Sequence, residues 1–78
     1  MNEQETPYIY EIRPCKAGNG FQLTSDVLLS GPVWYTRIPQ AIGFAKFYSR
    51  SHLAVIRVYD GKGRLVEVHR HKGDLEEP

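Results

Sequence analysis

The chain has 78 residues, of which 41% are hydrophobic and 24% are charged, and its formal net charge at pH 7 is +1. A chain of this length forms one domain with a small core, and such domains often gain stability from disulfides, metals or self-association. The single cysteine, Cys15, excludes an internal disulfide, and no Cys/His spacing typical of zinc sites is present. Self-association is therefore the expected additional source of stability. The apolar content excludes a chain that is disordered throughout.

The cellular location of the protein is predicted from features that its sequence lacks. No basic segment followed by an apolar run occurs near the N-terminus, and no apolar run approaches the ~20 residues that span a bilayer. With a single thiol, these features predict a protein of the reducing cytoplasm without membrane contact. Residues 1–6 are polar and acidic and are expected to form a flexible arm.

Three strands are predicted before the helix. Residues 8–13 are rich in aromatic and β-branched residues, and Pro14 ends this strand because proline has no N–H for the ladder. Residues 15–20 contain two glycines and an asparagine, which is typical of a turn. Residues 21–25 alternate again and are predicted to fold back on the first strand. After an irregular segment, 33–35 is expected to be a short third strand.

One amphipathic helix is predicted, with Thr36 as its N-cap and its end near Ser49. Pro39 would occupy the third helical position, where its missing N–H is harmless. Apolar residues at spacings of three and four define the face toward the core: Ile38, Ala41, Ile42, Ala45, Tyr48 and Ser49. Gly43 weakens the helix by roughly 1 kcal/mol and lies on the far side with Phe47.

A β-hairpin is predicted over 54–60 and 64–70, joined by a three-residue loop that ends at Gly63 in the left-handed region. This loop sets a register that pairs Val58 with Val66, Ile56 with Val68, and Ala54 with Arg70. The other face of the hairpin then pairs Arg57 with Glu67, which are opposite charges. The expected register therefore gives one nearly apolar face, which a slip of one residue would lose.

The predicted order of elements is β-β-β-α-β-β, which defines an α+β fold. Residues 7–72 are expected to form a single domain, a small antiparallel sheet with one helix packed on one face. The acidic segment 73–78 is expected to be a flexible tail.

Three segments resemble a family of short bacterial proteins of unknown function with the same order of elements. The first is Tyr35 to Ile42 followed by Ala45, which matches a helix opening of the form x-T-x-x-x-x-A-I-x-x-A. The others are Gly20-Phe21 before the second strand and the turn from Asp60 to Arg64. The resemblance covers about residues 8–72 and implies a shared fold. The family usually has acidic residues at the position of Pro39 and a charged helix back where this chain has Gly43 and Phe47. No functional residue is carried over.

No reactive or metal-binding constellation is predicted. His69 and His71 share a face of the predicted strand and could supply two ligands of a metal site. Such a site needs a third and a fourth ligand, and only His52 and Cys15 remain as candidates. Cys15 has no candidate base. The glycines at 18–20 and 61–63 lead into strands and not into a helix N-terminus, as a phosphate loop would require. The sequence thus predicts a non-enzymatic protein with no catalytic residue, metal or cofactor.

Surplus apolar side chains predict an interface. Phe44 and Phe47 lie off the core stripe of the helix, and several apolar residues fall on the outer face of the hairpin. The expected interface residues of a symmetric homodimer are Phe44, Phe47, Leu53, Val55, Tyr59 and Leu65. The leading prediction is therefore a self-associating interaction module, which binds another protein or a small ligand.

An alternative is a nucleic-acid-binding accessory protein. Residues 37–72 hold eight basic side chains against Asp60 and Glu67, a net charge of +6. The expected contacts on the hairpin are Arg57, Arg64, Arg70 and Lys72. Two features oppose this interpretation, since Glu67 would neutralise Arg57 and the acidic tail follows the basic strand. Basic side chains are also the usual solvent-facing residues of a helix and a hairpin.

Overall fold

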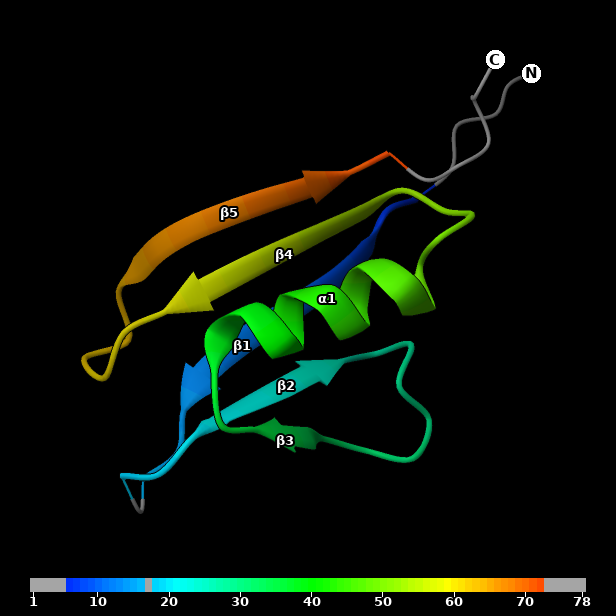
Figure 1. The fold of residues 1–78 in the computed structure, drawn as a ribbon. Helices are drawn as coiled ribbons and strands as arrows, with labels where there is room; N and C mark the ends of the chain where they lie inside the picture. The colour runs from blue at the N-terminus through cyan, green and yellow to red at the C-terminus, as the bar shows by residue number, and fades with distance from the viewer. Residues whose placement is uncertain (1–5, 17, 73–78) are drawn as a thin grey trace.

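A computed structural model describes residues 6–16 and 18–72 of the chain (Figure 1). Five strands form one sheet, and a single helix crosses one of its faces. The elements are β1 (Tyr8–Pro14), β2 (Phe21–Ser25), β3 (Val33–Tyr35), α1 (Ile38–Tyr48), β4 (Ala54–Tyr59) and β5 (Leu65–His71). The predicted α+β class, the order of elements and the one packed helix are confirmed. Residues 1–5 of the expected arm and the expected tail at 73–78 lie outside the described residues.

The sheet is mixed, and not antiparallel as expected. Its strand order is β3-β2-β1-β4-β5, and β1 pairs with β4 in parallel, while the other three pairs are antiparallel. The parallel pair arises because α1 crosses the sheet between β3 and β4, so that β4 runs beside β1 in the same direction. The strand nearest the N-terminus therefore lies at the centre of the sheet.

The core lies between α1 and the sheet. Alternate residues of the central strands face the helix and are fully buried, namely Tyr10, Ile12, Leu23, Ile56 and Val58. On the helix, Ala41 and Ala45 are fully buried, and Ser49 just beyond its end is 1% exposed. These small residues allow the helix to lie close to the sheet. The predicted core face of the helix is thus confirmed at its centre, while Tyr48, at 43% exposure, lies on its rim.

The helix begins one residue later than predicted, because Arg37 and not Thr36 is the N-cap. Pro39 is consequently the second helical residue, where its missing N–H is still harmless. The side chain of Gln40 caps the start of the helix. Its Oε1 accepts hydrogen bonds from the Arg37 N–H at 3.1 Å and from the Thr36 hydroxyl at 3.0 Å.

Phe44 is not a surplus apolar residue. Its ring is half-buried against the core, with ring centroids 6.1 Å from Tyr35 and 5.7 Å from Tyr48. Phe47 is exposed as predicted, at 64%, and the Arg50 guanidinium lies 4.9 Å from the centre of its ring. Only Phe47 of the two phenylalanines is therefore available to a partner.

The loop of the β4–β5 hairpin agrees with the prediction. The Gly63 N–H donates to the Asp60 carbonyl at 3.0 Å, and the Asp60 N–H donates to the Arg64 carbonyl at 2.9 Å. Gly63 has a φ of +83°, which is the left-handed conformation that closes such a loop. The first pair after the loop, Tyr59 with Leu65, also matches the expected register.

Beyond that pair the predicted register is wrong by one residue. A β-bulge between Val58 and Tyr59 shifts the pairing. The observed partners are Val58 with Glu67, Ile56 with His69, Arg57 with Val68, Val55 with Arg70, and Ala54 with His71. Arg57 therefore does not face Glu67, and the valines of β5 point away from the core, at 54% exposure for Val66 and 44% for Val68.

Candidate functional site

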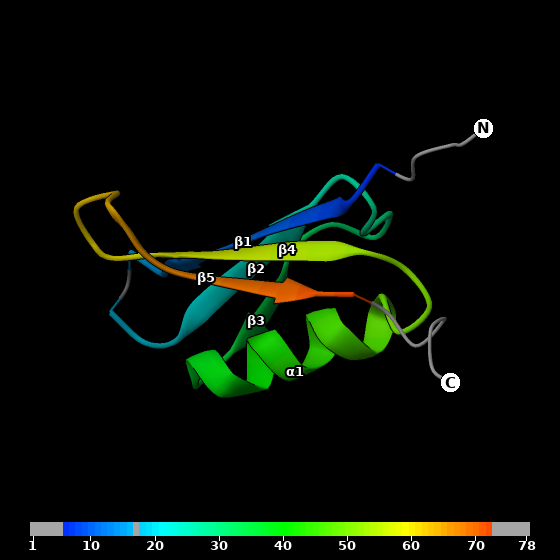
Figure 2. The same ribbon diagram turned by 90° about the horizontal axis from the view of Figure 1, so that it is seen from above.

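One face of the sheet is uncovered. Figure 2 shows α1 on one side of the sheet, and within residues 6–16 and 18–72 no other helix or strand lies over the opposite side. We call this opposite side the open face. Side chains that are paired across strands share a face, and the registers place these residues on the open face: Ile9, Glu11, Arg13, Gln22, Thr24, Trp34, Val55, Arg57, Tyr59, Leu65, Val68 and Arg70.

A row of side chains crosses the open face from β3 to β4. Gln22 is paired with Trp34 on one side and with Arg13 on the other. The Arg13 guanidinium carbon lies 4.0 Å from the centre of the Tyr59 ring, which continues the row onto β4. Trp34 is 60% exposed. The row thus combines two aromatic rings with a guanidinium stacked on one of them.

The open face carries more positive than negative charge. Three arginines, Arg13, Arg57 and Arg70, lie on it with one carboxylate, Glu11. The Arg13 Nη2 donates to the Glu11 Oε1 at 2.9 Å. Arg57 is paired with Glu11 in register, but it forms no ion pair within the part of the chain that the structure describes. The net charge of the face is therefore positive.

Further basic residues flank one end of this face. The β1–β2 turn and the β4–β5 loop both lie at the left end of the sheet in Figure 1, and they carry the exposed residues Lys16, Lys62 and Arg64. The carboxylate of Asp60 is engaged within its loop, because its Oδ1 accepts hydrogen bonds from the Lys62 and Arg64 N–H groups at 2.8 and 2.9 Å. This end of the sheet is consequently the basic end.

The other end of the open face carries both signs of charge, because Arg70 is paired there with Val55, which lies level with Ile9. A hollow of about 300 Å³ lies there and is lined by Ile9, Glu11, Thr24, Ser25 and Asp26. Two carboxylates contribute to its wall. Positive charge is thus more concentrated at the basic end of the face than at the end with this hollow.

The two edges of the sheet differ in length. β3 has three residues, whereas β5 has seven and carries three exposed apolar side chains, Leu65, Val66 and Val68. The helix packs mainly against β1 to β4, and among the described residues no strand pairs with the outer edge of β5. A long uncovered edge strand has unpaired backbone groups that can pair with another strand.

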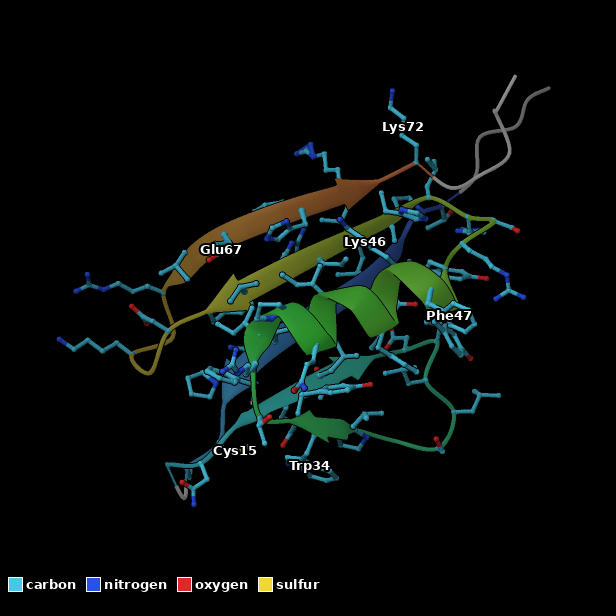
Figure 3. The ribbon with its side chains drawn as sticks, viewed as in Figure 1. Cys15, Trp34, Lys46, Phe47, Glu67 and Lys72 are labelled. Atoms are coloured by element: carbon cyan, nitrogen blue, oxygen red, sulfur yellow. The ribbon has the colours of Figure 1, made fainter. Side chains whose placement is uncertain are left out.

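A groove runs between α1 and β5 on the helix side of the sheet. It has a volume of about 620 Å³ and is lined by Ile38, Pro39, Ile42, Gly43, Lys46, Glu67 and His69. The His69 Nε2 lies 2.8 Å from the Glu67 Oε1. Figure 3 shows Lys46 on the helix and Glu67 on β5. Because the β-bulge turns Glu67 and His69 inward, this side of β5 is polar.

The residues considered as candidates for reactive or metal chemistry lie in separate parts of the fold. The described residues contain no group of three or more His, Cys, Asp or Glu side chains that could hold a metal ion. Cys15 is half-buried in the β1–β2 turn. His71 is paired with Ala54, and its buried Nε2 has no hydrogen-bond partner among the described residues. Burial raises the pKa of the Tyr10 and Tyr35 phenols, so both hydroxyls are neutral at physiological pH.

The predicted interface residues fall on two separate surfaces. Val55, Tyr59 and Leu65 lie together on the open face, and Leu53 is half-buried just before β4. Phe47 lies on the helix, on the other side of the sheet. Phe44 belongs to the edge of the core. No single surface therefore holds all six residues.

The predicted nucleic-acid contacts are partly brought together. Arg57 and Arg70 share the open face, Arg64 lies in the hairpin loop and Lys72 is exposed beyond β5. Arg13 and Trp34 were not predicted from the sequence as candidate contact residues. The alternation of β1 already placed Arg13 opposite to the core side, but its position beside Tyr59 depends on the parallel β1–β4 pair.

Comparison with protein-family models, with curated proteins and with solved structures gives no match for this chain. The resemblance to short bacterial proteins therefore remains a prediction. Within the described ranges, no helix has the length and apolar character needed to cross a membrane.

Proposed function

We propose that this protein is a non-enzymatic interaction module that associates with a second copy of itself through β5. The observation that carries this proposal is the long, uncovered edge strand with exposed Leu65, Val66 and Val68. Two strands that pair across such an edge would satisfy backbone groups and remove apolar side chains from water. For a domain this small, such burial adds to a limited core.

The sequence of β5 is self-complementary when it pairs with itself. A two-fold axis at Val68, the middle residue of the strand, lets all of Leu65–His71 pair in an antiparallel ladder. In this register Glu67 lies opposite His69 of the second copy, and Val68 lies beside its own symmetry mate. Each Glu67–His69 pair, 2.8 Å apart within one chain, would then be joined to the same pair of the other chain.

Two other surfaces suit self-association less well. Face-to-face packing of two open faces would bring Arg13, Arg57 and Arg70 of each copy toward like charges, which is costly on burial. The opposite edge, β3, has three residues and offers a short template. The strand β5 has neither disadvantage.

The mass of the particle in solution tests this proposal. We expect light scattering after size exclusion to give twice the 9.0 kDa chain mass at high protein concentration. Val68→Lys would place two ammonium groups side by side at the axis, so this variant should run as a monomer. Leu29→Lys is the matched control, because Leu29 is 94% exposed in the β2–β3 loop, away from β5.

Amide hydrogen exchange provides a second readout. In a dimer, the outward-facing amides of β5 become more protected as the protein concentration rises, while those of β3 do not change. A wild-type chain that remains a monomer at millimolar concentration, or a Val68→Lys variant that remains a dimer, would contradict pairing through β5.

A further inference from the structure

We propose that the open face binds single-stranded nucleic acid, with bases stacked on Trp34 and on the Arg13–Tyr59 pair. This inference uses a different surface from the proposed self-association and does not depend on it. It follows from the aromatic and basic residues that the registers bring together, some of which are distant in the sequence.

The stacking positions come from the row of side chains across the sheet. Trp34 is 60% exposed and presents a ring to solvent. Tyr59 lies three strands further along, on β4, and the guanidinium carbon of Arg13 lies over its ring, 4.0 Å from the ring centre, so the pair forms a second stacking platform. Neighbouring strands are ~4.8 Å apart, so the two platforms are about 14 Å apart. A short single strand that follows the row would place different bases on the two platforms.

The charge around the row suits a phosphate backbone. Arg13 and Arg57 lie on the open face, and Lys16, Lys62 and Arg64 lie in the two loops at its basic end. The Asp60 carboxylate is already engaged by two backbone N–H groups of its own loop. At the opposite end Arg70 lies near two carboxylates, Glu11 and Asp26, so the positive charge that would hold phosphates is concentrated at the basic end of the face.

Single strands fit this surface better than two other anionic partners. A sheet five strands wide measures about 20 Å, whereas the major groove of duplex DNA is about 12 Å wide. An acidic peptide would use the arginines and leave the exposed Trp34 ring without a partner. Unpaired bases use both the charges and the rings.

Trp34 makes the test direct, because it is the only tryptophan of the chain. We would titrate the full-length protein with oligo-dT and oligo-U of about twelve nucleotides, within the usual footprint of single-strand binders. Fluorescein anisotropy reports binding, and quenching of tryptophan emission reports stacking. We expect both signals to saturate together at about 25 mM salt, with affinity falling steeply toward 150 mM salt. Comparison of the two oligonucleotides separates DNA from RNA.

Two pairs of variants separate this site from general charge attraction. Trp34→Ala should weaken binding about five- to a hundredfold, while Phe47→Ala, an exposed ring on the helix, should leave it unchanged. Arg57→Gln should weaken binding and lower the salt slope by ~0.7, while Lys46→Gln removes the same charge on the helix side with little effect. Circular dichroism confirms that each variant is folded.

Several outcomes would overturn the inference. One is an absence of binding by wild type at low salt, and another is binding without tryptophan quenching. Equal weakening by Lys46→Gln and Arg57→Gln would indicate unspecific attraction, and a polyglutamate peptide that binds as tightly as oligo-dT would assign the face to acidic peptides. Val68→Lys adds a positive charge to the face, so it should abolish the dimer while oligonucleotide binding is kept, which distinguishes the two proposals.

Discussion

The hydroxyl of Tyr10 lies 2.6 Å from the Oγ of Ser49, in the interior of the protein. Tyr10 is fully buried on β1, and Ser49, at 1% exposure, follows the last residue of α1. The hydrogen bond therefore fixes the end of the helix to the central strand. It also satisfies two buried polar groups that would otherwise be without a partner, which is costly in a protein interior.

Removing either partner of this bond should destabilise the fold. Tyr10→Phe leaves the Ser49 hydroxyl buried and unpaired, and Ser49→Ala does the same to the phenol, so each change should cost about 1–3 kcal/mol of unfolding free energy. The double variant should lose less than the sum of the two, because only one hydrogen bond is removed. Urea denaturation measures all three, and strictly additive losses would contradict this coupling.

Alkaline pH should destabilise the protein through the buried phenols. Burial raises the pKa of Tyr10 and Tyr35 above the ordinary value of 10.0. The folded chain thus holds its phenolic protons more tightly than the unfolded chain does. Their contribution to stability is complete below pH 10 and is lost as the pH rises through the raised pKa.

Urea midpoints measured from pH 8 upward should accordingly be level at first and then decrease above about pH 10. Tyr10→Phe removes one of the two titrating groups and should make this decrease shallower. A variant whose midpoint falls as steeply as that of wild type would show that Tyr10 does not contribute.

Two glycines of the β1–β2 turn should respond differently to alanine. Gly18 and Gly20 have φ values of +89° and +83°, so alanine is strained at both, by about 1–2 kcal/mol. At Gly20 a Cβ would also lie 2.6 Å from the carbonyl oxygen of Tyr35, whereas at Gly18 it meets nothing within 4 Å. Thermal unfolding should show a clearly larger loss for Gly20→Ala, and equal losses would contradict this close approach.

The register of the β4–β5 hairpin can be tested with two alanine variants. Ile56 is fully buried and Val68 is 44% exposed on the open face. Ile56→Ala should cost about 2–5 kcal/mol, and Val68→Ala should change the stability of the monomer by ~0.5 kcal/mol or less. The register expected from sequence would instead place Val68 opposite Ile56 on the buried face, so comparable losses in a dilute denaturation series would favour that register.

Local signals in the sequence predicted the elements well. The bounds of β2 and β3 and the left-handed Gly63 follow from alternation and turn composition, and the buried Ala41 and Ala45 follow from helical spacing. These features depend on residues that are close together in the chain. The start of the helix differed by one residue because Thr36 bonds to Gln40 without being the N-cap.

Non-local features could not be predicted in the same way. The parallel β1–β4 pair joins residues 46 positions apart, such as Ile12 and Val58, and no local pattern encodes it. The β-bulge next to Tyr59 shifts the pairing of the rest of β5, and no local pattern encodes it either. One signal was present, since the expected register placed Arg70 on the apolar face opposite Ala54. The set of site residues predicted from the sequence was therefore incomplete, because Arg13 lies beside Tyr59 only as a result of the parallel β1–β4 pairing.

The central position of β1 has a consequence for synthesis on the ribosome. Residues 8–14 emerge before the other strands and can pair with β2 once it follows, but their second neighbour is present only after residues 54–59 have left the exit tunnel. Until then one side of β1 has no strand beside it, and isolated hairpins are at best marginally stable. The second side of β1 is thus paired only after residues 54–59 have emerged, and until then this central strand presents an unpaired edge.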